Sequence, residues 1–432
     1  MNLMFRASWL AAVALLLTAL AATVAASGQA AKLPRYKLQV GQELVYKREG
    51  EFNYEGGKFR DRATWHHWVV RTNKDGSWHL VIRHASVFSQ GDAVNERETV
   101  TFAWCDLFPD GRLVENESFG FQMKPLTLLL RLPSDAEEAA KGWSAKDTRM
   151  DETYHYRLQA GTTPDQCVVE AKRESPMNEI YGFTFKDTLS FDTQRGFPDK
   201  IESENKQTYG FKGTGHATLK LEEVKTHDAA WTQAFAAEAE RYFEAQTAYS
   251  KVTAKRDLAP ADLKLALEKA AAGLKTAQAD LKLAELQKQI ETLLSEHEQF
   301  AKYYVEVAER RAAVLDKPAA EWSTVDLEGK PHALKDYRGK VVILDFWYRG
   351  CGWCVRAMPQ MKQIATHFKD QPVAVIGMNT DRNEDDARFV IKKMGLNYTN
   401  LKAEGLPEKY KVQGFPTLLI IDQAGIVRDI HT

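Results

Sequence analysis

Residues 341–354 read VVILDFWYRGCGWC, an apolar run that leads directly into two cysteines separated by two residues. The run is apolar except for Asp345, which is typical of a strand buried on both faces of a sheet. Residues 355–368 then read VRAMPQMKQIATHF, a pattern that favours a helix. The cysteine pair, Cys351 and Cys354, is therefore predicted to lie where a buried strand passes into a helix.

This position favours redox chemistry at the cysteine pair. The unpaired N–H groups and the positive dipole end of a helix stabilise a thiolate, so we expect a lowered pKa at Cys351. Arg349 and Arg356 add positive charge close by in the sequence. The two-residue spacing allows Cys354 to close a small disulfide ring with Cys351, and so to resolve a mixed disulfide formed with a substrate.

Two other interpretations of the pair are a zinc site and a purely structural disulfide. A zinc site needs a second pair of Cys or His ligands, and His332, His367 and His431 stand at unsuitable spacings. The second interpretation is a purely structural disulfide. Disulfides between cysteines separated by two residues at a helix N-terminus are, however, usually reactive. The sequence therefore predicts a redox-active pair and no metal.

The C-terminal part of the chain resembles the thioredoxin fold, and specifically the exported TlpA/ResA-like thiol–disulfide oxidoreductases. The resemblance covers about residues 320–432 and includes a lead-in segment at residues 326–340. It rests on the motifs Asp345-Phe346-Trp347, Cys351-Gly352-Trp353-Cys354, Pro359 and Gly414-Phe415-Pro416-Thr417.

The resemblance implies a role for four residues. Cys351 is expected to be the nucleophile and Cys354 the resolving cysteine, with Pro416 as a cis-proline facing the disulfide. Asp345 is expected to be a buried acid with a raised pKa that exchanges a proton with Cys354. The alternative for Asp345 is a satisfied core carboxylate. The resemblance also implies protein disulfide or dithiol substrates, a redox partner in the membrane, and no metal or organic cofactor.

Two features depart from the family pattern. This subgroup often carries a proline before the second cysteine, whereas the chain has Trp353, so the direction of electron flow stays open. The family also continues with a helix after the segment that corresponds to residues 426–430. We therefore expect a thioredoxin-like domain at residues 317–432 that lacks its last helix, because the chain is incomplete or because another part covers that sheet face.

The composition is that of a soluble globular protein with several domains. The 432 residues correspond to two to four domains at roughly 100–200 residues each, with 44% hydrophobic and 27% charged residues. The 58 basic and 59 acidic side chains give a net charge of -1, which argues against a nucleic-acid-binding protein.

The N-terminus, residues 1–26, reads as a secretory signal peptide. Arg6 precedes an apolar stretch at residues 10–24, and small residues stand just before Ser27. The stretch is shorter than the ~20 residues that span a membrane, although an uncleaved anchor remains the alternative. We expect export to the periplasm or cell envelope, where disulfides persist.

Residues 32–225 are predicted to form an all-β domain, a sandwich or a half-barrel, because short alternating segments are separated by turn signals. Cys105 and Cys167 lie in this region as a structural disulfide or as two buried thiols, which the sequence leaves open. A metal site is disfavoured, because the neighbours His66 and His67 must point to opposite faces of a strand. His79 and His84 follow in the same segment, and all four are expected to be structural or surface histidines.

Residues 227–316 are predicted to form a helical arm. They are rich in strong helix formers, and Pro260 marks the bend of a helical hairpin.

The predicted function is that of an exported thiol–disulfide oxidoreductase in a multidomain chain. A peroxidase of the peroxiredoxin type needs a Pro-x-x-x-Thr/Ser pattern before a lone cysteine, and residues 347–351 read WYRGC instead. The alternative from another class is a cell-envelope binding protein whose β domain recognises a ligand and whose thioredoxin-like domain is non-catalytic.

Overall fold

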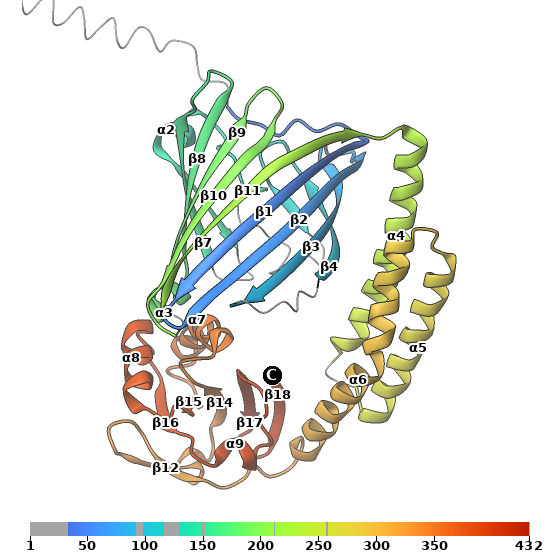
Figure 1. Cartoon of the computed structure of the whole chain (residues 1–432). Coiled ribbons are helices and arrows are strands. Elements are labelled where there is room, and N and C mark those ends of the chain that lie inside the picture. Colours follow the sequence, from blue (N-terminus) through green and yellow to red (C-terminus); the bar gives the residue numbers. More distant parts are fainter. Residues whose placement is uncertain are drawn as a thin grey trace, which may run out of the picture.

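A computed structural model describes residues 33–91, 98–115, 129–147, 152–210, 212–255 and 258–431. Its three parts follow one another along the chain: a large curved sheet, a group of long helices, and a smaller α/β domain (Figure 1). The predicted signal peptide, residues 1–26, lies outside the described residues. Among the helices that the structure describes, none is both long and apolar enough to cross a membrane.

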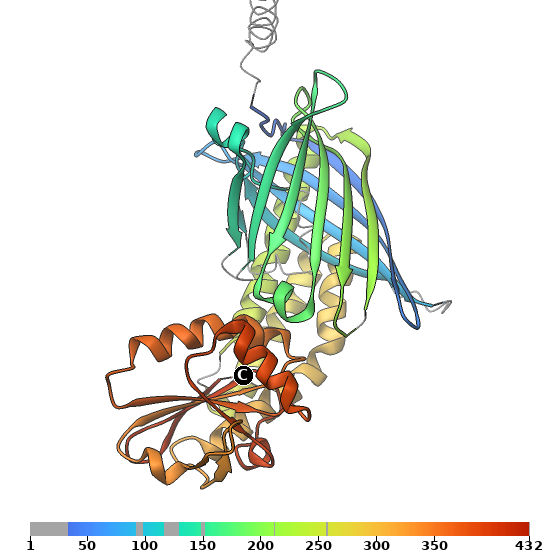
Figure 2. The same ribbon diagram turned by 90° about the vertical axis from the view of Figure 1, so that its left-hand side faces the viewer.

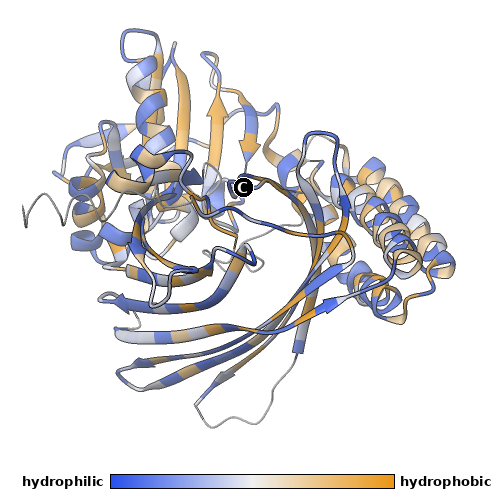
Figure 3. Ribbon diagram, turned by 90° about the horizontal axis from the view of Figure 1, so that it is seen from above, coloured by the Kyte–Doolittle hydropathy of each residue, from blue (hydrophilic) through white to orange (hydrophobic). Residues whose placement is uncertain are grey.

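The large sheet is antiparallel, and its order in the described residues is β5-β4-β3-β2-β1-β11-β10-β9-β8-β7-β6. Strands β1 and β11 pair with each other at its centre, so β5 and β6 are the edges. The sheet curves into an open half-barrel (Figures 2 and 3). Its strands are β1 (Gln42–Tyr54), β2 (Gly57–Thr72), β3 (Trp78–Gln90), β4 (Glu98–Leu107), β5 (Leu113–Glu115), β6 (Trp143–Asp147), β7 (Glu152–Ala160), β8 (Gln166–Glu174), β9 (Thr184–Asp192), β10 (Phe197–Gln207) and β11 (Gly213–Thr226).

The two faces of the half-barrel bury different sets of side chains, as the two-residue period of a strand requires. One face packs against the segments around Tyr36 and Leu130, and it forms the largest apolar core among the described residues. The other face packs against the helices, where Trp68 lies 4.8 Å from the ring of Phe235. Two short helices, α2 (Ala136–Lys141) and α3 (Pro176–Tyr181), interrupt the strand sequence.

The helical part contains three helices in the described residues, α4 (Ala229–Thr253), α5 (Pro260–Asp280) and α6 (Ala284–Val314), so the predicted hairpin is wrong by one helix. Pro260 begins α5 as expected. The missed break follows Asp280, where the backbone N–H groups of Lys282 and Leu283 donate to the carboxylate of Glu238, at 2.6 and 3.1 Å. A distant side chain caps this break, and no glycine or proline marks it.

The C-terminal domain has a mixed sheet of order β16-β15-β14-β17-β18. Central β14 (Val341–Trp347) is parallel to β15 and antiparallel to β17, and its side chains Leu344, Phe346 and Trp347 are fully buried. The other elements are β12 (Ser323–Val325), β13 (Pro331–Ala333), η2 (Leu334–Tyr337), α7 (Gly352–His367), β15 (Val373–Asn379), α8 (Glu384–Met394), β16 (Thr399–Lys402), α9 (Leu406–Lys409), β17 (Thr417–Ile421) and β18 (Val427–His431).

Candidate active site

The cysteine pair lies at the junction of β14 and α7, where the sequence predicts it. Cys351 is the N-cap residue of α7, and it forms a disulfide with Cys354. The backbone N–H of Cys354 donates to the Sγ of Cys351 at 3.0 Å. An N–H group at a helix N-terminus stabilises negative charge on this sulfur once the disulfide is reduced.

Asp345 lies on β14 two residues before Trp347, so both side chains point to the same face of the sheet. Trp347 packs in one apolar cluster with both cysteines, which places Asp345 on the face that α7 covers. Burial raises the pKa of Asp345 to about 7, against a lowering by the hydroxyl of Tyr398, which donates to Oδ2 at 3.5 Å. Oδ1 of Asp345 has no hydrogen-bond partner in the described structure.

Pro416 lies at the same edge of the sheet as the disulfide. The Phe415–Pro416 peptide bond is cis. Thr417, the next residue, pairs with Phe346 at the C-terminal end of β14, just before the cysteine segment. The ring of Phe415 meets the ring of Tyr348 edge-on at 5.2 Å. The fold thus brings together segments that lie about sixty residues apart in the sequence.

Helix α3, from the half-barrel, covers the disulfide. Cys351 is 5% exposed and Cys354 is 2% exposed, and both cluster with Ile180 and Tyr181 of α3. The Cε of Met177 lies 3.0 Å from the position that a Cβ on Gly352 would take. Sequence reasoning missed these residues, because nothing in the local sequence around residue 177 signals a contact with a motif 175 residues away.

The two arginines beside the cysteines are both paired with carboxylates. Arg349 contacts Asp386 at 2.6 Å, and its guanidinium lies over the rings of Tyr209 and Phe389, at 3.6 and 4.2 Å. Arg356 lies 3.8 Å from Glu152 of the half-barrel. Their charge therefore acts on the disulfide less than the sequence alone suggests, because each is partly balanced by a neighbouring carboxylate.

Comparison with known proteins agrees with this site. The model of the AhpC/TSA family matches residues 315–430. The thiol-disulfide oxidoreductase ResA of Geobacillus kaustophilus is 31% identical over 126 residues, which are 29% of this chain and 72% of the relative. The chain belongs to the thiol-disulfide oxidoreductase family.

Two further comparisons concern the same part of the oxidoreductase. The thioredoxin-like protein YneN of Bacillus subtilis is 31% identical over 117 residues, covering 26% of this chain and 68% of the relative. The thioredoxin domain of a thiol-disulfide oxidoreductase from Bacteroides vulgatus, a crystal structure, is 28% identical. It covers 27% of this chain and 88% of that one, with a TM-score of 0.26.

The other two cysteines of the oxidoreductase form no disulfide with each other. Cys105 lies on β4 and Cys167 on β8, both buried, and six strands of the sheet stand between them. The sequence left open a structural disulfide or two buried thiols, and the structure shows two buried thiols. The reason is the strand order, which puts the two residues on separate walls of the half-barrel. Burial raises the pKa of Cys167 to about 11.

The histidines of the half-barrel are spread over both faces of the sheet. His66 stacks on Trp68, whereas its neighbour His67 packs against Tyr46 in the opposite core. His66 and His227 both contact Glu43, at 2.7 and 2.6 Å. Burial lowers the pKa of His67 to about 3 and that of His84 to about 4. Within the described residues, no group of three or more His, Cys, Asp or Glu side chains could hold a metal ion.

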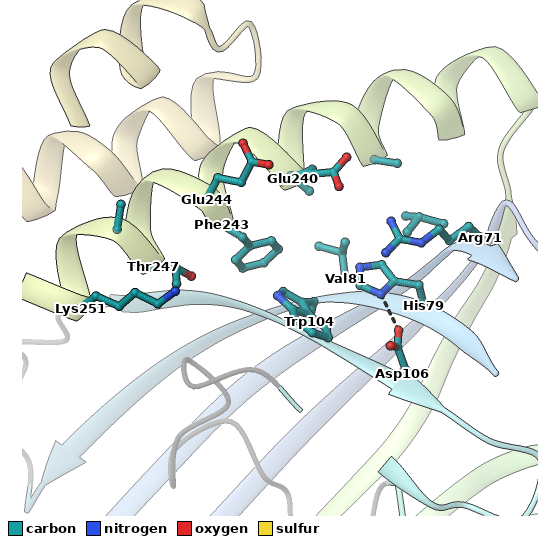
Figure 4. Close-up of a pocket in the computed structure, with 14 residues that line it drawn as sticks. Arg71, His79, Val81, Trp104, Asp106, Glu240, Phe243, Glu244, Thr247 and Lys251 are labelled. Carbon is teal, nitrogen blue, oxygen red and sulfur yellow. Dashed lines mark hydrogen bonds and ion pairs between the residues drawn. The ribbon is translucent and has the colours of Figure 1, made fainter. Parts of the chain in front are cut away.

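A cavity of about 480 Å³ lies between α4 and the helix-facing side of the half-barrel (Figure 4). His79 contacts Asp106 at its floor, at 2.5 Å, beside the ring of Trp104. Glu240 and Lys251 line its helix side. Its lining includes no residue of the disulfide site, so it takes no part in the chemistry described above.

Proposed function

We propose that the chain is an exported thiol–disulfide oxidoreductase whose Cys351/Cys354 pair exchanges a disulfide with protein substrates. The observation that carries this proposal is the position of Cys351 at the N-cap of α7, with the N–H of Cys354 on its sulfur. A binding protein with a non-catalytic domain needs no such arrangement, and the family membership does not favour that alternative.

In the reducing direction, the thiolate of Cys351 attacks one sulfur of a substrate disulfide. A mixed disulfide forms, and the other substrate sulfur leaves as a thiolate. Cys354 then loses its proton and attacks the Sγ of Cys351, which re-forms the Cys351–Cys354 disulfide and releases the second substrate thiol. Two electrons pass to the substrate. The same steps in reverse oxidise a substrate dithiol, and the reduction potential of the pair sets the direction.

Asp345 is the proton acceptor that we assign to the second step. A carboxyl with a pKa of about 7 is close to equally protonated and ionised at neutral pH, so it can both take and return a proton. Its Oδ1, which has no hydrogen-bond partner in the described structure, leaves one oxygen open to do so. Pro416 lies at the same edge of the sheet as the disulfide, and we assign it the role of presenting the backbone of the substrate to the cysteines.

The proposal also covers the setting of the reaction. A signal peptide at residues 1–26 would take the chain to the periplasm or cell envelope, and a redox partner in the membrane would regenerate the pair. No metal or organic cofactor is needed, since the electrons pass between sulfurs. We further propose three domains, residues 32–225, 227–316 and 317–432, of which the first two hold the third on its substrate.

The test is a trapping experiment with serine variants of the full chain. Cys354→Ser should accumulate a covalent mixed disulfide with a protein substrate, because the resolving thiol is gone and Cys351 still attacks. Cys351→Ser should trap little, and Cys105→Ser should behave as the unmodified chain. Non-reducing electrophoresis followed by mass spectrometry identifies the cysteine that carries the adduct. Equal trapping by the Cys351 and Cys354 variants contradicts the assignment of roles.

A further inference from the structure

The surface that surrounds the disulfide is covered by one short helix of the half-barrel. Helix α3 contacts both α7 and α8, and it lies directly against α7 in Figure 1. The side chain of Met177 packs against Gly352, a residue that lies between the two cysteines in the sequence. Disulfide exchange needs the substrate sulfur to reach the Sγ of Cys351 in line with the bond that breaks. With Cys351 only 5% exposed, a protein disulfide cannot do so while α3 is in place.

The contacts of α3 fall into an apolar centre and a charged periphery. At the centre, Ile180 and Tyr181 join the cluster of the two cysteines, and the hydroxyl of Tyr181 donates to the carbonyl oxygen of Arg349. At the periphery, Glu179 of α3 pairs with Lys393 of α8 at 3.4 Å. Nearby, the buried Glu152 of β7 pairs with Arg356 of α7 at 3.8 Å.

The thioredoxin-like side of this contact thus presents cations and aromatic rings around the disulfide. Lys393 and Arg356 supply the charges, and Trp353 is 58% exposed with the guanidinium of Arg356 at 5.0 Å from its ring. Tyr348, which is 36% exposed, lies on the other side of Cys351 in the sequence. The half-barrel meets this surface with carboxylates and with the side chain of Met177.

We propose that this surface is the docking site of the protein partner. Helix α3 is a lid that occupies this site and presents the same kinds of side chain as the partner. The partner then carries a hydrophobic side chain beside its reacting cysteine, in the place of Met177. It also carries a carboxylate that meets Lys393, in the place of Glu179. This inference rests on the proposed function of Cys351, and it adds the class of substrate: a cysteine in an acidic and apolar segment.

The contacts of the lid are of a kind that a partner can replace. The side chains of Glu179 and Lys393 are 61% and 48% exposed, and ion pairs at such exposure contribute little to stability. Helix α3 has six residues, and no disulfide ties it to the domain it covers. A segment that offers equivalent contacts therefore shifts the population toward the open form, since it binds that form alone.

The test of the docking surface compares two synthetic peptides on the reduced full chain. Both hold one cysteine next to a methionine, activated as a mixed disulfide with thionitrobenzoate; one is flanked by glutamates, the other by lysines. Attack by Cys351 releases coloured thionitrobenzoate. We expect the acidic peptide to react about tenfold faster at low salt. Lys393→Glu should reduce this ratio about threefold, while Lys392→Glu, an adjacent change of equal charge, should leave it unchanged.

The test of the lid uses a charge reversal on α3 itself. Glu179→Lys should raise the rates of both peptides about threefold, because like charges then face each other at Lys393. Glu170→Lys breaks a comparable pair with Lys186, at 3.2 Å and away from the disulfide, and should change neither rate. Equal rates for the two peptides overturn the docking surface, and unchanged rates in Glu179→Lys overturn the lid. Failure of dithiothreitol to reduce Cys351–Cys354 in every variant overturns the proposed function instead.

Discussion

The four cysteines of the chain form two pairs in opposite circumstances. Cys351 and Cys354 lie at the start of a helix, bonded to each other and within one apolar cluster. Cys105 and Cys167 lie inside strands on separate walls of the half-barrel, and burial raises the pKa of Cys167 to about 11. All four are buried, so burial alone does not make a cysteine reactive. The backbone position decides, because only a helix N-terminus directs N–H groups at the sulfur.

The first prediction concerns the reactive cysteine pair and has the greatest effect on the rate. Cys351→Ser should lower the rate of reduction of a protein disulfide by at least about ten-thousandfold, because it removes the nucleophile. Cys105→Ser, which changes the same atom in a buried strand, should keep the rate within about twofold. An insulin-turbidity assay measures both. A large loss in Cys105→Ser with the fold intact would mean that the half-barrel cysteines take part in the chemistry.

A second difference between the pairs is the acid on the strand that leads to Cys351. Burial raises the pKa of Asp345 to about 7 in the folded chain, from its ordinary value of 3.8. The folded state therefore holds a proton that the unfolded state releases, so stability falls as the pH rises from about 4 to 7. Asp345→Asn, which cannot ionise, should be more stable than the unmodified chain above pH 7, by up to about 4 kcal/mol.

Urea unfolding at pH 5 and pH 8 measures this difference. The stabilisation by Asp345→Asn should be much larger at pH 8 than at pH 5. Asp187→Asn removes a half-barrel acid whose pKa burial also raises, so it serves as the positive control and should change stability in the same direction. An equal effect of Asp345→Asn at both pH values would show that the carboxyl ionises freely in the folded chain.

The same substitution should slow the resolving step. Above pH 7 the ionised Asp345 can accept the proton of Cys354, so the rate of resolution should rise with pH through about 7 and then level off. Asp345→Asn should lose this step in the profile and resolve about a hundredfold more slowly at pH 7.5. Alkylation of Cys351 by iodoacetamide should change little. A pH profile unaltered by the substitution would reduce Asp345 to a structural residue.

The sequence was sufficient for the reactive pair but not for its surroundings. Strand, cysteines and helix are consecutive in residues 341–368, and local patterns report such an arrangement directly. The cover over Cys351 comes from α3, and the break before α6 is capped by Glu238, more than forty residues upstream. Contacts of this kind depend on how separate elements pack, and no periodicity or turn signal in either segment records them. The missed helix and the missed lid have this common cause.

The last prediction concerns the two cysteines of the half-barrel, where only a small change in stability is expected. Cys167→Ala should leave the redox activity unchanged and lower the free energy of unfolding by about 1 kcal/mol, because it removes one buried sulfur from a packed core. Cys105→Ala, at a fully buried position on β4, should likewise leave the redox activity unchanged and lower the free energy of unfolding. Urea unfolding gives the stability, and the double variant should lose about the sum of the two, since the residues lie on different walls and share no bond. A double variant that loses much less than this sum, under oxidising conditions only, would show that the two thiols do pair in solution, because each single variant would already have broken the bond. The contrast between the two cysteine pairs would then be wrong.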